Sequence, residues 1–175
     1  DNLLSIAKVY KYEDYITVNI SSPNTPNLRD FHNEKNIIGL VDAIDLKVSE
    51  LNIQTPLFLK ISPDESHENI ENISNLIELS SLSGLIVSNT TLDKSSLDKS
   101  KKNLEGGVSG APLMKKSTEM MKKISTKHPS MPIIGVGGVL KKDDFLKKIE
   151  FGASLVQIYS GFIIKGPKIV SEILQ

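Results

Sequence analysis

The stretch that decides the fold reads YITVNISSPNTPNLR and covers residues 15–29. Its first residues, Tyr15 to Val18, alternate in the manner of a β-strand. The strand then enters a run of amides and hydroxyls, a loop with two prolines, and the only arginine of the chain, Arg29. In parallel α/β folds, ligands bind at the carboxyl ends of the strands. This dense set of uncharged hydrogen-bonding side chains therefore lies where a binding site is expected.

Five strand-like runs recur along the chain, and each is followed by a helical pattern. The runs are Tyr15–Ser21, Pro56–Ser62, Gly84–Asn89, Pro132–Gly137 and Ser154–Ser160. The second to fourth are nearly continuous apolar runs, as expected for strands that are buried on both faces of a parallel sheet. The alternation of strand and helix predicts βαβ units, a parallel sheet and an α/β fold.

Apolar residues at helical spacing lie between these runs. The stripes are Ile37, Val41, Ile44, Val48 and Leu51; Ile70, Ile73 and Ile77; Met121 and Ile124; and Leu146 and Ile149. We expect the third helix to begin at Ser117 and the fourth to be capped by Asp143 or Asp144 and ended by Gly152. Pro167 suits the first turn of a last helix.

Three further features bear on organisation. The lysine pairs Lys141-Lys142 and Lys147-Lys148 are expected on the solvated face of the fourth helix. The long connection from Thr91 to about Met114 is polar until residues 106–110, GGVSG, and connections of that length tend to be functional or disordered. The chain starts without an initiator methionine in what reads as the middle of a helix, so we expect a piece of something longer.

Length and composition bound the class of protein. The 175 residues suffice for one domain but not for a closed (β/α)₈ barrel, which needs roughly 250. A formal net charge of +0 gives no excess of positive charge that would indicate nucleic-acid binding. The absence of cysteine excludes disulfides, thiolate metal sites and a cysteine nucleophile. His32, His67 and His128 lack metal-ligand spacing, so we expect no metal site.

The block NISSPNTP at residues 19–26 resembles the active-site segment of dihydroorotate dehydrogenases of the membrane-associated, quinone-linked class. Further blocks match this family in order and spacing: SNTT at 88–91, GGVSG at 106–110, PIIGVGG at 132–138 and QIYSGF at 157–162. One departure is Asn27, where the family usually has glycine; asparagine tolerates the left-handed conformation. The resemblance implies an FMN-binding (β/α)₈ barrel, of which residues 1–175 would be the C-terminal part of a single domain, about strands 4 to 8.

The resemblance also implies a reaction and its residues. The reaction is oxidation of (S)-dihydroorotate to orotate, with flavin mononucleotide (FMN) as cofactor and quinone as electron acceptor. Ser22 would be the catalytic base that removes a proton from C5 while C6 gives a hydride to the flavin. The family's substrate contacts correspond to Asn19, Asn24, Asn89 and Thr90. Its flavin contacts correspond to Asn19, Lys60, Ser88, Gly110, Gly138, Tyr159 and Ser160, with Lys60 near the flavin N1 and O2.

Simpler interpretations of the same residues stay open. A serine before proline is commonly a turn residue, and Asn19, Asn24 or Asn89 alone would cap turns. Lys60 interrupts the apolar run 57–61 and could extend to the rim of the sheet. Arg29 could fasten the active-site loop or lie exposed on the surface.

A part barrel would expose two sheet edges, which a closed barrel does not have. We therefore expect the chain either to self-associate or to need a missing N-terminal half. The full-length protein would be peripheral at the inner membrane, and this chain alone soluble. Two alternative functions stay open: a non-catalytic half-barrel that binds FMN or phosphate or only self-associates, and another enzyme of the flavin barrel group.

Overall fold

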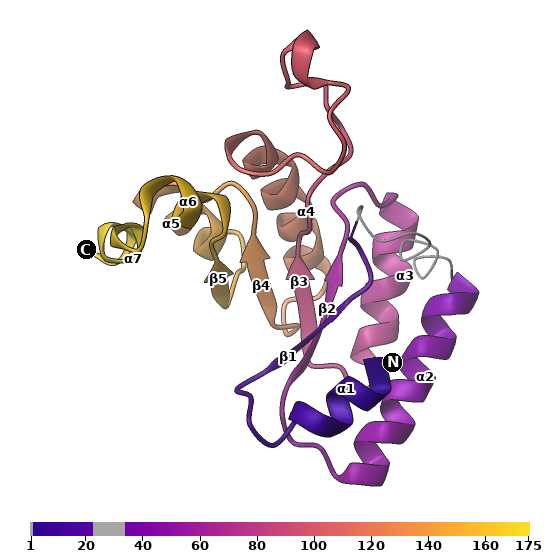
Figure 1. Ribbon diagram of the computed structural model, residues 1–175. Coiled ribbons are helices and arrows are strands. Elements are labelled where there is room, and N and C mark those ends of the chain that lie inside the picture. The colour runs from indigo at the N-terminus through magenta and orange to yellow at the C-terminus, as the bar shows by residue number, and fades with distance from the viewer. Residues whose placement is uncertain (1, 23–33) are drawn as a thin grey trace.

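The structure, a computed structural model, describes residues 2–22 and 34–175. The described residues form one parallel sheet in the order β1-β2-β3-β4-β5 (Figure 1). The strands are β1 Ile16–Asn19, β2 Leu57–Ile61, β3 Gly84–Val87, β4 Ile133–Val136 and β5 Leu155–Gln157. Each strand lies inside the run predicted for it, and the parallel sheet is confirmed.

Helices connect the strands in turn. They are α1 Asn2–Val9, α2 Glu34–Leu51, α3 His67–Glu78, α4 Met114–Lys127, α5 Lys142–Glu150, α6 Ser160–Lys165 and α7 Lys168–Leu174, with short 3₁₀ turns η2 Lys99–Lys101 and η3 Ala111–Leu113. Helices α2, α3 and α4 lie beside one another against the sheet (Figure 1). Spatial order that follows chain order is the arrangement of consecutive βα units in a (β/α)₈ barrel, so the fold is a partial barrel.

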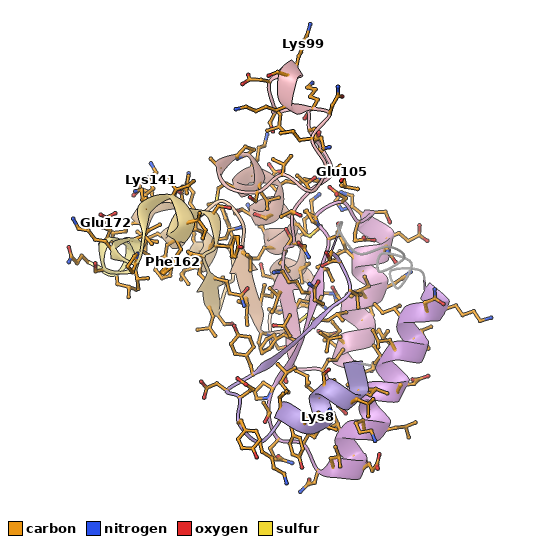
Figure 2. The ribbon with its side chains drawn as sticks, viewed as in Figure 1. Lys8, Lys99, Glu105, Lys141, Phe162 and Glu172 are labelled. Atoms are coloured by element: carbon orange, nitrogen blue, oxygen red, sulfur yellow. The ribbon has the colours of Figure 1, made fainter. Side chains whose placement is uncertain are left out.

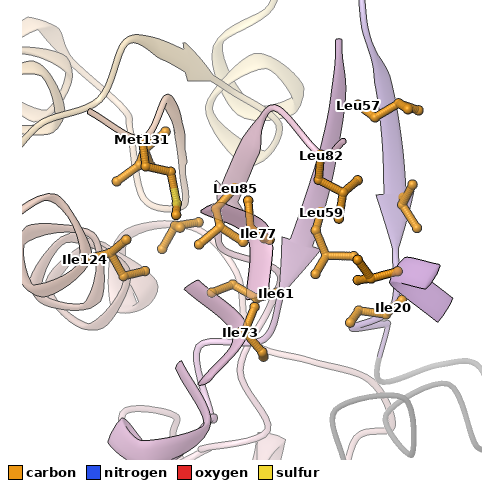
Figure 3. Packing of buried hydrophobic residues seen from close by; sticks show 14 of the residues in the cluster. Ile20, Leu57, Leu59, Ile61, Ile73, Ile77, Leu82, Leu85, Ile124 and Met131 are labelled. Atoms are coloured by element: carbon orange, nitrogen blue, oxygen red, sulfur yellow. The ribbon is translucent and has the colours of Figure 1, made fainter. Parts of the chain in front are cut away.

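The core lies between the sheet and its helices. Leu59, Leu85 and Ile133 face the helices, are wholly buried and pack with residues of α3 and α4 such as Ile77 and Ile124 (Figure 3). The alternate residues Phe58, Ile86 and Ile134 form a separate cluster on the other face. Burial of one large aliphatic side chain is worth about 1.5–3 kcal/mol. The two clusters confirm that the middle strands are buried on both faces.

Two expected helix starts are wrong. Helix α4 begins at Met114, directly after η3, and not at Ser117. Helix α5 begins at Lys142, and Asp143 and Asp144 lie in its first turn, where acidic side chains favour the helix dipole. The Asp144 carboxylate instead accepts a hydrogen bond from the Leu140 backbone N–H (3.1 Å). Gly152, with φ of 100°, follows the end of α5 as expected.

The orientation of α5 also differs from the expectation. Leu146 and Ile149 are 48% and 41% exposed, and Lys148 is wholly buried. The prediction of a solvated Lys148 is therefore wrong, while Lys147 is exposed as expected. The hydrogen bonds that Lys148 makes to α4 and β4 explain the difference, because they hold its ammonium inside. The end of the last strand differs as well. Residues 158–160, which belong to the run predicted for it, lie outside β5, and Ser160 begins α6.

The connection between β3 and α4 projects from the body of the molecule (Figure 1). A bridge between Thr91 and Val108 closes its base, and Lys99 lies at its tip (Figure 2). The two ends of the projection return to the carboxyl edge of the sheet. No helix among the described residues is both long and apolar enough to span a membrane.

Gly84 allows β3 and the segment before β4 to approach closely. A Cβ added at Gly84 would lie 2.0 Å from the backbone carbonyl oxygen of Pro132. That carbonyl accepts a hydrogen bond from the Leu85 N–H (3.2 Å), so it cannot move without loss of sheet pairing. We predict that Gly84→Ala lowers the free energy of unfolding by about 1–3 kcal/mol, measured by urea denaturation.

The matched control for Gly84 is Gly39 in α2, where an added Cβ would meet no atom within 4 Å. Gly39→Ala should raise the free energy of unfolding by about 0.5–1 kcal/mol, because alanine favours the helix interior. Equal effects of the two substitutions would contradict the proposed close approach.

Candidate active site

Side chains from the ends of β1 and β3 meet across the intervening strand β2. The Asn19 Oδ1 accepts hydrogen bonds from the Ser21 backbone N–H (3.2 Å), the Ser21 hydroxyl (3.2 Å) and the Asn89 Nδ2 (3.3 Å). Asn89 Nδ2 also donates to Ser21 Oγ (3.1 Å). We call Asn19, Ser21 and Asn89 the amide cluster. It gathers carboxamides and a hydroxyl at the carboxyl edge of the sheet.

The residues after β3 orient the Asn89 side chain. Thr90 N–H donates to Asn89 Oδ1 (2.8 Å), and the buried Ser88 hydroxyl donates to the Asn89 carbonyl (3.0 Å). The Val87–Ser88 peptide bond is cis. The Asn89 carboxamide is therefore held at both its oxygen and its nitrogen.

A pocket of about 410 Å³ opens beside the amide cluster. Its lining includes eight residues predicted from the sequence: Lys60, Ser88, Asn89, Thr90, Gly110, Gly138, Tyr159 and Ser160. These residues come from five different stretches of the chain, at the ends of β2, β3 and β5 and in the glycine turns before α4 and after β4. The structure thus brings most of the predicted site into one cavity.

Lys60 contributes a cation to this pocket. It lies on β2 between Asn19 of β1 and Ile86 of β3 in the register of the sheet. Burial lowers the pKa of the Lys60 ammonium from its ordinary value, because desolvation disfavours the charged form. A half-buried cation in a pocket wall stabilises negative charge that is bound or develops beside it.

Glycine turns form another part of the pocket wall. Gly137 and Gly138 have φ of 105° and 83°, and a Cβ at Gly138 would lie 2.4 Å from the Met114 Cβ. The neighbouring Ser160 hydroxyl, at the start of α6, donates to Ser109 Oγ (2.9 Å). A glycine turn beside a helix start lets backbone N–H groups face an anion such as phosphate.

Among the lining residues that sequence reasoning did not assign to the site are three polar ones, Tyr15, Ser109 and Gln157. Gln157 Nε2 donates to the Tyr15 hydroxyl (2.8 Å), and the Tyr15 ring meets Phe58 edge-on, with centroids 5.8 Å apart. Gln157 opens the block QIYSGF, from which Tyr159 and Ser160 were assigned, so the block itself was a usable signal. The Tyr15–Gln157 contact joins the first and last strands and depends on the curl of the sheet.

The structure says less about two predicted site residues, the catalytic Ser22 and the substrate-binding Asn24. Ser22 is half-buried and adjoins the amide cluster, but the described lining of the pocket does not include it. Asn24 lies outside the described residues, as do Arg29 and His32. Their predicted roles stay predictions.

A second polar group fastens the base of the projecting connection. Asp64, after β2, pairs with Lys116 of α4 (2.6 Å) and accepts hydrogen bonds from the Leu92 N–H (2.8 Å) and the Thr91 hydroxyl. Burial alone would raise the pKa of Asp64, but the hydrogen bonds from Lys116, Thr91 and Leu92 hold it below its ordinary value. We call Asp64, Thr91 and Lys116 the loop latch.

Comparison with known proteins agrees with this arrangement. The family model described as dihydroorotate dehydrogenase matches residues 1–175. The chain therefore belongs to the dihydroorotate dehydrogenase family.

Within the family, the similarity is to quinone-linked members. The chain is 39% identical to "Dihydroorotate dehydrogenase (quinone)" of Christiangramia forsetii over 100% of this chain and 52% of that protein. It is 42% identical to the protein of the same name from Escherichia coli over 99% of this chain and 54% of that protein. The chain thus spans about half the length of these relatives.

Solved structures give the same result. The ligand-free dihydroorotate dehydrogenase of Eimeria tenella superposes with a TM-score of 0.92 at 30% identity, over 99% of this chain and 53% of that one. The structure of the Eimeria tenella protein in complex with ferulenol has a TM-score of 0.90. These matches confirm the partial-barrel fold predicted from the sequence.

The loop latch makes a pH-dependent contribution to stability. We predict that Asp64→Asn lowers the free energy of unfolding by about 1–2 kcal/mol at pH 7, because hydrogen bonds to a charged, partly exposed carboxylate are lost. Because folding depresses the pKa of Asp64, its stabilisation is present above the unfolded value near 3.9 and is lost as pH falls through the folded value. Urea denaturation at pH 7 and at pH 3 should therefore show the difference shrinking in acid.

Asp98 provides the control for this prediction. Its contact with Lys101 is long (3.9 Å) and both side chains are exposed. Asp98→Asn should change the free energy of unfolding by less than about 0.5 kcal/mol at either pH. A pH-independent effect of Asp64→Asn would contradict the role given to the carboxylate charge.

Proposed function

We propose that this chain is the C-terminal part of an FMN-binding barrel domain that oxidises (S)-dihydroorotate to orotate and passes the electrons to quinone. The observation that carries the proposal is the amide cluster beside a pocket that is lined by a cation and by glycine turns. Membership of the dihydroorotate dehydrogenase family supports it.

The pocket residues fit the requirements of FMN. Lys60 would face the part of the flavin that becomes negative on reduction, and Gly110, Gly138 and Ser160 would receive the phosphate end. Asn19, Ser88 and Tyr159 would complete the contacts. FMN, when bound, supplies the acceptor for the hydride from C6 of dihydroorotate.

The amide cluster would orient the substrate. Orotate presents alternating carbonyl and N–H groups, which carboxamides match because each offers both a donor and an acceptor. Asn19, Asn24, Asn89 and Thr90 would make these contacts. Ser22 would take the proton from C5, which requires exclusion of water and a route for the proton, because a hydroxyl is a weak base in water.

A second function, a non-catalytic half-barrel, is favoured by one observation. Leu155 on β5 and Ile163 and Ile164 on α6 are 57%, 70% and 71% exposed. Within the described sheet, β1 and β5 each pair with one strand only. We propose that the other half of a barrel, or a second copy of this chain, covers this surface.

The full-length protein would be peripheral at the inner membrane.

An anaerobic absorption titration tests the proposed function. FMN is added first and dihydroorotate second, while the visible band of the bound flavin is followed. We expect bleaching, because hydride transfer reduces the flavin. Binding without bleaching would favour the half-barrel that only holds a cofactor. Absence of binding would contradict the proposed oxidation for this chain and favour a half-barrel that only self-associates.

Substitution of Ser22 tests the proposed base. In Ser22→Ala we expect FMN affinity to change less than about twofold, while the rate of bleaching falls by about 10²–10⁴, the range for loss of a general base. Stopped-flow absorbance measures the rate. Ser100→Ala, in the exposed turn η2, is the control and should leave the rate unchanged. An unchanged rate in Ser22→Ala would remove Ser22 from the mechanism.

Substitution of Lys60 tests the cation. Lys60→Met should make the reduction potential of the bound flavin more negative by about 30 mV or more, because negative charge loses its stabilising partner. A dye-linked reductive titration measures the potential. Lys99→Met, at the tip of the projecting connection, should leave it unchanged (Figure 2). A potential that is unchanged in Lys60→Met would contradict the assignment.

A further inference from the structure

Lys148 of α5 is a buried cation that the proposed mechanism does not use. Its relative exposure is 0%, although Lys147 beside it is exposed. Its side chain passes behind β4, where a Cβ added at Gly135 would lie 3.3 Å from the Lys148 Cδ. Glycine at position 135 therefore leaves room for the lysine stem against the strand.

The Lys148 ammonium is tied to the backbone that leads into the glycine turn. Its Nζ donates to Ser117 Oγ (2.7 Å) and to the Val136 carbonyl (3.3 Å). The Ser117 hydroxyl in turn donates to the Gly137 carbonyl (3.2 Å), with the Met114 carbonyl of its own helix at 3.3 Å as a second acceptor. Lys148 thus holds two successive carbonyls, one directly and one through Ser117.

The charge of Lys148 has no close anionic partner in the described part of the chain. Among residues 2–22 and 34–175, no carboxylate oxygen lies within 4.0 Å of its Nζ, and Asp144, four residues before it, accepts from Leu140 instead. Desolvation lowers the pKa of Lys148 to about 8, and the charge of Asp144 opposes this shift with a smaller effect. Most molecules therefore carry the charge on Lys148 at pH 7. A buried ammonium that faces neutral oxygens is costly.

The position of these carbonyls determines where the turn presents its N–H groups. The Gly137–Gly138 peptide is trans, so the Gly138 N–H points opposite to the Gly137 carbonyl. Because Ser117 holds that carbonyl, the N–H is directed to the other side of the turn. Val136, Gly137 and Gly138 all line the pocket, so the ammonium lies behind the pocket wall.

We propose that Lys148 is a positioning residue for a dianionic phosphate ester bound at the Gly137-Gly138 turn. It fixes the backbone of residues 136–138 through Val136 and Ser117 and supplies positive charge from behind the wall, without touching the ligand. The inference rests on the proposed function, which makes the phosphate of FMN that ester. The missing counter-charge of Lys148 is then supplied by the ligand.

Comparison of FMN with riboflavin, which lacks the phosphate, tests the proposal. Lys148→Met replaces the charge with an apolar chain of similar length. By fluorescence titration, we expect its dissociation constant for FMN to rise about tenfold, and that for riboflavin to change less than about twofold. Lys147→Met, at the exposed neighbouring position, should change neither constant.

Two measurements separate positioning from a structural role. The thermal midpoint of unliganded Lys148→Met should not fall, because removal of a buried, unpaired charge offsets lost hydrogen bonds. Ser117→Ala, which removes the Lys148–Ser117 and Ser117–Gly137 hydrogen bonds but keeps the charge of Lys148, should weaken FMN binding by a smaller factor and leave riboflavin binding unchanged. If these variants bound FMN and riboflavin more weakly by the same factor, the role given to Lys148 would be overturned, while the proposed function would stand. Absence of binding of both flavins to the unsubstituted chain would overturn the proposed function with it.

Discussion

The constraint on which the rest of the structure depends is the burial of β2, β3 and β4 on both faces. Leu59, Leu85 and Ile133 pack against helices, while Phe58, Ile86 and Ile134 pack on the inner face. Such strands have little room for polar side chains along their length, because an unpaired buried polar group is costly, and Lys60, near the carboxyl end of β2, is the exception in these three strands. Polar groups are consequently displaced to the strand ends, and parallel pairing brings those ends to one edge.

That edge becomes a site because its polar groups satisfy one another. Asn19 accepts from Ser21 and Asn89, and Asn89 is oriented in turn by Thr90. Side chains held by neighbours keep one geometry, which is what recognition of a planar ring with alternating donors and acceptors requires. The loop latch anchors the other end of the same segment, since Thr91 directly follows Thr90.

Prediction succeeded where the signal was local and failed where it was not. The strands follow from apolar runs, and eight residues of the predicted site share one pocket. The orientation predicted for α5 was wrong, because its apolar stripe, Leu146 and Ile149, is short and its lysines look solvated in isolation. Lys148 is buried through contacts with Ser117 and Val136, which lie 31 and 12 residues away in the sequence. No helical period records such a partner.

The sequence by itself determined the alternation of strand and helix, the polar strand ends, the glycine turns and the family resemblance. These depend on neighbouring residues and on periods of two or 3.6, which a linear chain displays. Only the tertiary structure decided that Tyr15 meets Gln157, that the amide cluster spans β1 and β3, and that Lys148 lies behind the glycine turn. Each of these contacts joins separate segments of the sequence that meet only when the strands pair and the helices pack on the sheet, a geometry that no single segment encodes.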